Sequence, residues 1–144
     1  MQSWTAHLNY CCTTCTNVPR IIHFEIVASE PEREIKFYKD VFGWEFSKWN
    51  GPQDYWLVKT GGDSLPGING GLAPKRDQHG GSQGSKMTNT IDVPSIDDFS
   101  EKIQRGGGKV LSPKIPIAGV GYLAICQDPE GITFGIIQTD QSAT

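Results

Sequence analysis

The chain has 144 residues, of which 37% are hydrophobic and 20% charged, a composition typical of one ordinary globular domain. Its formal net charge of −3 gives no electrostatic basis for binding nucleic acid or an anionic membrane. No apolar run approaches the roughly 18–20 residues that a bilayer-spanning helix needs. Because its start also lacks the pattern of a secretory signal, we expect a cytoplasmic protein.

Residues 1–19 are polar and without periodicity, so we expect an N-terminal extension outside the fold. This segment carries Cys11, Cys12 and Cys15, the last two in a CxxC spacing. A structural zinc site usually needs a second pair of ligands further along the chain, and the sequence offers none. We therefore expect reduced thiols on a loosely held tail, and a small core residue at Cys126.

A first β-α-β-β-β unit is predicted for residues 20–74. Residues 21–28 are typical of a strand, and Ser29 with Glu32 has the spacing of a helix capping box. Gly43 is expected to end that helix in a left-handed conformation. Three further strands are predicted at 44–49, 55–60 and 67–73. The last of them is rich in glycine, which predicts close approach to another backbone or to a ligand.

The same order recurs about 65 residues later, after residues 75–86, which have the composition of a flexible linker. This second unit covers residues 87–139 and leaves 140–144 as a tail. Ser95 is expected to cap its helix, and a run of three glycines is expected to end it. Its strands are predicted at 88–93, 109–113, 119–127 and 132–138. The chain therefore contains two copies of one supersecondary unit.

Three segments carry a family resemblance: IIHFEIVASEPEREIKFYKDVFGWEF, EKIQRGGGKV and QDPEGITFGIIQ. They resemble the vicinal oxygen chelate superfamily, which includes glyoxalase I, extradiol dioxygenases and bleomycin-resistance proteins. The resemblance covers about residues 21–139. It implies an α+β fold in which two βαβββ modules form a cupped, incomplete barrel of about eight strands with two main helices. It also implies a homodimer, because family members commonly complete their cups by pairing.

In the metal-using members of this superfamily, the ligands lie on the first strand of each module, on the last strand and sometimes on an inner strand. Here those positions fall on His23, Thr88, Gly135, and Val58 or Lys59. Three or four His, Glu or Gln side chains must converge on one ion, and only His23 is retained. We therefore expect no cofactor. The alternative is a divalent metal held by His23 and Glu25 and completed by a substrate.

Strand parity predicts which residues line the cup. If His23 faces inward, so does Glu25, and these two are the candidate catalytic residues, as general base or ligand-binding donor. The candidate ligand-binding residues are the aromatic, small or hydroxyl-bearing positions Trp49, Trp56, Thr88, Thr90, Tyr122, Thr133 and Gly135. Gly135 is predicted to leave space where metal-using relatives carry a carboxylate. A cavity with such walls is the usual form of a small-molecule site.

The favoured function is a metal-free protein that binds a small hydrophobic or aromatic compound between its two modules. Two alternatives stay open, because the superfamily hosts many activities. The first is an enzyme: a lyase or isomerase that uses His23 and Glu25 for proton transfer, or a glyoxalase-like or dioxygenase-like protein with unusual ligands. The second is a dimerisation or regulatory module without a small ligand.

Overall fold

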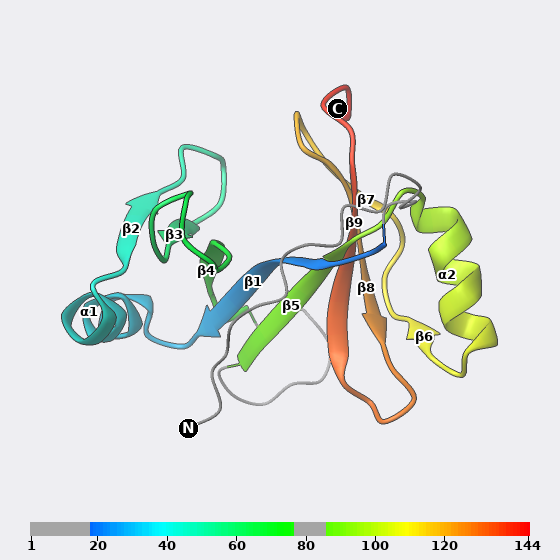
Figure 1. Ribbon diagram of the computed structural model, residues 1–144, viewed down its shortest axis with the longest axis horizontal. Coiled ribbons are helices and arrows are strands. Elements are labelled where there is room, and N and C mark those ends of the chain that lie inside the picture. Colours follow the sequence, from blue (N-terminus) through cyan, green and yellow to red (C-terminus); the bar gives the residue numbers. More distant parts are fainter. Residues whose placement is uncertain (1–17, 77–85) are drawn as a thin grey trace.

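The computed structural model describes residues 18–76 and 86–144, and within these ranges it contains two helices and one mixed sheet of nine strands (Figure 1). The predicted N-terminal cysteines and most of the predicted linker lie outside the described residues. The elements in chain order are β1 (Ile21–Ala28), α1 (Pro31–Phe42), β2 (Glu45–Lys48), β3 (Trp56–Lys59), β4 (Gly70–Pro74), β5 (Lys86–Asp92), α2 (Ile96–Arg105), β6 (Lys109–Val110), β7 (Ile115–Ile117), β8 (Gly121–Gln127) and β9 (Thr133–Thr139).

The sheet topology confirms the predicted duplication. The strand order is β2-β3-β4-β1-β5-β9-β8-β6, and in both halves the first strand pairs in parallel with the last strand, β1 with β4 and β5 with β9. The two first strands pair antiparallel with each other and so join the modules at the centre of the sheet. The sheet curves without closing into a barrel (Figure 1).

One strand of the described chain was missed by the sequence prediction. β7 is only three residues long, contains Pro116, and pairs antiparallel with β8 outside the main strand order. Proline donates no backbone hydrogen bond and is confined to sheet edges or bulges, so its presence argues against a strand. A segment of three residues also gives almost no periodic signal. The other eight strands lie where they were predicted, with ends that differ by at most three residues.

Each module has its own hydrophobic core beneath its helix. Phe24, Ile26 and Ala28 alternate along β1 and are buried against α1, together with partners on β3 and β4. The second core lies under α2 and includes Ile96 and Ile136, with 2% and 1% of their surface exposed. Because β1 and β5 are paired in register, both helices cover the same side of the sheet.

The start of α1 differs from the prediction. The N-cap residue is Glu30 rather than Ser29, the Glu30 side chain makes no cap hydrogen bond, and Pro31 takes the first position. The helix therefore begins one residue later than the predicted Ser29–Glu32 capping box requires. Proline has no N–H to satisfy and its φ already suits a helix, so it fits this first position. The end is as predicted, with Gly43 at φ 70°.

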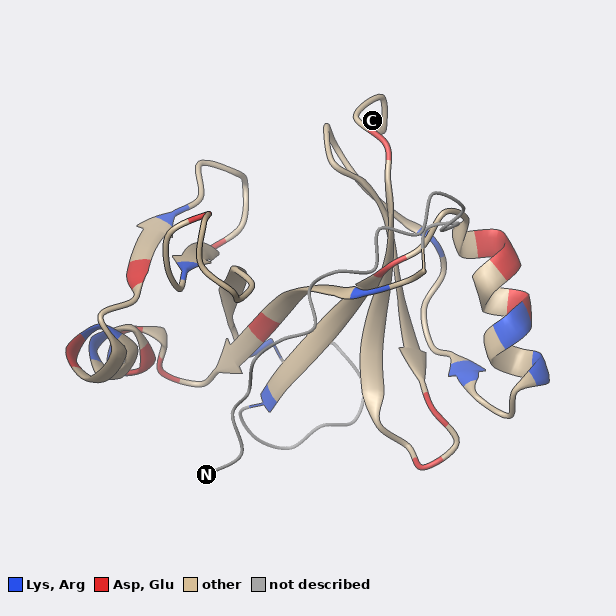
Figure 2. Ribbon diagram, in the orientation of Figure 1, with Lys and Arg blue, Asp and Glu red and all other residues tan. Residues whose placement is uncertain are grey.

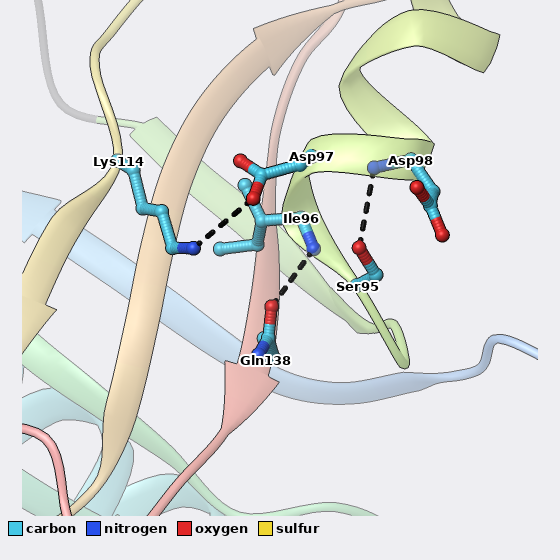
Figure 3. Close-up of polar contacts among 6 residues, drawn as sticks. All are labelled: Ser95, Ile96, Asp97, Asp98, Lys114 and Gln138. Carbon is cyan, nitrogen blue, oxygen red and sulfur yellow. Dashed lines mark hydrogen bonds and ion pairs between the residues drawn. The ribbon is translucent and has the colours of Figure 1, made fainter.

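The start of α2 confirms the predicted cap and adds a tertiary one. The Ser95 hydroxyl accepts a hydrogen bond from the Asp98 N–H at 3.2 Å, and the Ile96 N–H donates to Gln138 Oε1 on β9 at 3.0 Å (Figure 3). Lys114 also lies 3.3 Å from the carboxylate of Asp97 (Figure 3). Two of the free N–H groups of the first turn are thereby paired.

Charged residues lie mainly on the helices, loops and strand ends (Figure 2). The middle of the sheet is thus left largely to apolar and small polar side chains. None of the helices that the structure describes is long and apolar enough to span a membrane.

Candidate functional site

The side of the sheet opposite both helices carries most of the predicted site residues, and we call it the His23 face. His23 and Glu25 alternate with the buried residues of β1 and are half-buried. Their cross-strand partners on β5 are Thr90 and Thr88, and Thr90 in turn lies opposite Gly135 of β9. Paired residues share a face, so β1, β5 and β9 bring these five residues together.

Thr133 lies on the same face, at the start of β9, two residues before Gly135 and paired with Gln127 of β8. Gly135 itself does not leave the space that was predicted. A Cβ atom there would lie 3.0 Å from Thr90 Oγ1 and 3.4 Å from a methyl of Leu123. Those two side chains take up the room that the absent side chain would need.

Tyr55 was not predicted as a site residue, yet its hydroxyl contacts both candidate catalytic residues. Its hydroxyl lies 3.2 Å from His23 Nε2 and is also hydrogen-bonded to Glu25. The phenol lies across Gly71 of β4, where a Cβ atom would be only 1.6 Å from the hydroxyl oxygen. Gly71 is opposite Glu25 in the β1–β4 register, so the glycine gives Tyr55 its place between the two side chains.

A sequence signal for this contact was present in the Gly70–Gly71 pair of β4. Strand glycines indicate a close approach, and both neighbours prove to be close: a Cβ on Gly70 would lie 2.4 Å from the Phe24 carbonyl oxygen. The sequence did not show that Tyr55, from the loop before β3, fills the space above Gly71.

Burial and charge set the protonation of this group. Burial lowers the pKa of His23 from its ordinary value of 6.5, because desolvation disfavours the imidazolium. The pKa of Tyr55 is raised well above its ordinary value of 10.0. Burial is the largest cause, followed by the negative charge of Glu25 and the hydrogen bond to Glu25. At neutral pH the face therefore presents a neutral imidazole beside a protonated phenol.

Trp49 joins the same side of the molecule. Its ring meets that of Tyr55 edge to face at a centroid distance of 6.3 Å, and its backbone N–H donates to the Tyr55 carbonyl at 2.9 Å. Its side chain is 41% exposed, so an aromatic surface remains accessible next to the polar group. The T-shaped contact also limits where the Tyr55 ring can lie.

Two predicted ligand-binding residues lie on the other side of the sheet. Trp56 packs against the α1 core, with the Lys48 ammonium 5.4 Å from its ring centroid. Tyr122 packs against the α2 core, with Lys114 4.8 Å from its ring centroid. Strand parity explains both positions, because each residue is two along from a buried core residue of its own strand.

The metal-ligand positions do not converge. Val58 is 2% exposed and belongs to the α1 core, whereas Lys59 is exposed. Thr88 and Gly135 offer no imidazole or carboxylate. Among the described residues, no three His, Cys, Asp or Glu side chains are grouped closely enough to hold an ion.

Two cavities in the described part of the chain have linings that do not include the candidate catalytic residues. One, of about 290 Å³, lies at one end of the sheet between Arg20, Asp92 and Gln138. The other, of about 240 Å³, lies beside Gly43 and Thr60. His23, Glu25 and Tyr55 line neither of them, and all three residues are half-buried.

Known proteins with similar sequences were found for this chain. The chain is 23% identical over 137 residues to the protein named "Putative glyoxylase CFP32" of Mycobacterium bovis and of Mycobacterium tuberculosis, a match that covers 94% of the chain. The chain spans about half the length of these curated relatives, 50% of each.

Solved structures resemble it in fold at low sequence identity. A hypothetical protein of Bacillus halodurans C-125 superposes with a TM-score of 0.66 at 13% identity, over 89% of this chain and 99% of that one. Methylmalonyl-CoA epimerase of Mycobacterium tuberculosis gives 0.62 at 12% identity, over 83% and 87% of the two chains. The sequence profile of one family matches residues 20–136, most of the chain. The protein therefore belongs to the Glyoxalase/Bleomycin resistance protein/Dioxygenase superfamily.

Proposed function

We propose that the protein binds a small organic molecule on the His23 face. The observation that carries this proposal is the half-buried contact between His23 Nε2 and the Tyr55 hydroxyl, with Glu25 bonded to the same phenol. Convergent polar groups beside an accessible aromatic ring are what a small-molecule site requires. Trp49 supplies that ring, with 41% of its surface exposed.

We further propose that binding does not need a resident metal. A bound ion needs three or four converging ligands, and among the family's ligand positions His23 is the one that offers an imidazole or carboxylate. The remaining family positions are a threonine, a glycine and a buried valine or exposed lysine. Elemental analysis of the purified protein tests this, because about one tightly held Ni, Zn, Mn or Fe per chain would contradict it.

Binding is tested by a screen of aromatic compounds, thiol adducts and 2-oxoaldehydes. A ligand of the native state raises the melting temperature by mass action. The matched variants are Trp49→Leu and Trp56→Leu, which remove an indole from the His23 face and from the α1 core respectively. We expect only Trp49→Leu to lower affinity once each variant is compared with its own ligand-free melting temperature. Equal affinity in Trp49→Leu and the unaltered protein would place the ligand elsewhere.

A second candidate function is acid–base catalysis, as in a lyase or isomerase. The observation that favours it is the lowered pKa of His23, which keeps the imidazole neutral and able to accept a proton at pH 7. Some proteins of similar fold are methylmalonyl-CoA epimerases. The assay is incorporation of deuterium from D₂O into carbon acids, including acyl thioesters and hemithioacetals. Exchange that His23→Gln abolishes would support an enzyme, and exchange that it leaves unchanged would not.

We also propose that two copies associate. Phe37, Val41 and Phe42 of α1 are 50%, 56% and 58% exposed, an apolar surface suited to a contact. Light scattering coupled to size exclusion gives the mass directly, and a monomer at micromolar concentration would contradict the proposal.

A further inference from the structure

The protons shared by Glu25, Tyr55 and His23 can be counted. An ionised carboxylate only accepts hydrogen bonds, and the phenol has one O–H to donate. In its bond to Glu25, the Tyr55 O–H is therefore the donor. The same oxygen lies 3.2 Å from His23 Nε2, and with its proton already committed it can only accept there.

It follows that the hydrogen on the neutral imidazole must be on Nε2. We infer that Tyr55 is a positioning residue that fixes the tautomer of His23, holding a proton on Nε2 and leaving the Nδ1 lone pair for a ligand that donates a hydrogen bond or a proton. This inference rests on the proposed function for the ligand, but the tautomer belongs to the free protein. In a neutral imidazole one nitrogen donates and the other accepts, so fixing Nε2 also fixes Nδ1.

Nδ1 is available to such a ligand. The Tyr55 hydroxyl lies against Nε2, so this contact does not engage Nδ1. His23 is half-buried rather than buried, so part of its side chain is reached by solvent. A ligand's O–H, N–H or acidic C–H can replace that solvent.

The arrangement therefore selects a chemical class. Compounds that carry a proton donor together with an aromatic or apolar group fit the Nδ1 acceptor and the exposed ring of Trp49, which meets Tyr55 edge to face. If the donor is acidic, its proton passes to Nδ1 and the bonding electron pair stays on the ligand. The resulting imidazolium still donates from Nε2 to Tyr55, whose own proton stays with Glu25.

The tautomer is tested by nitrogen-15 NMR of the His23 ring at neutral pH, without any ligand. We expect a protonated-type shift at Nε2 and an unprotonated-type shift at Nδ1. In Tyr55→Phe, the two shifts should move toward each other as both tautomers become populated. Tyr122→Phe removes a hydroxyl from the opposite side of the sheet and should leave both shifts unchanged. A proton on Nδ1 in the unaltered protein, or identical shifts in Tyr55→Phe, would overturn the inference.

A second variant keeps the test decisive if Tyr55→Phe fails to fold. Glu25→Gln lets the side-chain amide donate to the Tyr55 oxygen, so that the phenol proton can turn toward Nε2. We expect the Nδ1–H tautomer to become populated in this variant. A ring that stays wholly Nε2–H would show that Tyr55 does not relay the carboxylate to His23.

The ligand class is tested with phenol and anisole, which differ in a single donor group. Titration with phenol should displace the Nδ1 shift, whereas anisole at equal concentration should not. Equal displacement by both probes would refute the donor requirement while leaving small-molecule binding intact. Displacement by neither would refute the availability of Nδ1, and the tautomer measurement would stand separately.

Discussion

Replacing Gly71 with alanine should detach Tyr55 from His23. The new Cβ would lie 1.6 Å from the Tyr55 hydroxyl oxygen, and real Cβ atoms essentially never approach a neighbour within 3.0 Å. The hydroxyl must therefore move by at least 3.0 − 1.6 = 1.4 Å, unless β4 itself shifts. Either response loses the contact with His23 Nε2 or strains the sheet.

The loss of stability in Gly71→Ala follows from the hydrogen bonds that Tyr55 would lose. A hydrogen bond between neutral partners contributes about 0.5–1.5 kcal/mol, and one to a charged group about 1.5–3 kcal/mol. Tyr55 is half-buried, so water recovers part of this after displacement. We therefore expect Gly71→Ala to lower the free energy of unfolding by about 1–3 kcal/mol, in line with overpacking elsewhere.

Urea unfolding measures this loss against a matched control. Gly62 has no heavy atom within 4 Å of its would-be Cβ, so Gly62→Ala should change stability by no more than about 0.5 kcal/mol. In a Tyr55→Ala background, Gly71→Ala should lose most of its cost, because the clash is gone. A Gly71→Ala cost equal to that of Gly62→Ala, or one that persists without the phenol, would refute the proposed packing.

Three further measurements probe the fold and the site. Ser95→Ala removes the hydroxyl that accepts from the Asp98 N–H and should cost about 1 kcal/mol in urea unfolding; no loss would mean that Gln138 alone secures the helix start. Ile136→Ala should cost about 2–5 kcal/mol because 1% of the residue is exposed, whereas Ile132→Ala, at 64% exposure, should cost far less. Because burial lowers the pKa of His23, the unfolded chain takes up the proton first, so stability should fall as pH drops below 6.5. In His23→Gln this part of the pH dependence should disappear, and a curve parallel to that of the unaltered protein would argue against it.

Most of the fold could be predicted from the sequence because its signals are local and appear twice. Alternating apolar residues mark β1, and the conformational freedom of Gly43 marks the end of α1. The errors also have local causes. Pro31 fixes the first turn of α1, and β7 is too short and too close to a proline to show periodicity.

The candidate site could be predicted only in part. Parity along β1 placed His23 with Glu25, and the repeat placed Thr88 and Thr90 opposite them. The same alternation along β3 and β8 puts Trp56 and Tyr122 on the helix side of the sheet, contrary to the prediction that they line the ligand site. Loop residues have no such rule, which is why Tyr55 was missed.

By itself, the sequence determined the two βαβββ modules, the family and the side of the sheet on which His23 lies, because strand period and helix caps depend on neighbouring residues. Only the tertiary structure decided what His23 meets. The Tyr55 hydroxyl comes from a residue 32 positions away and reaches Nε2 across Gly71 of a third segment. The space above Gly71 exists only once β1, β3 and β4 have paired in register, so a side chain's partner there is set by packing rather than by pattern.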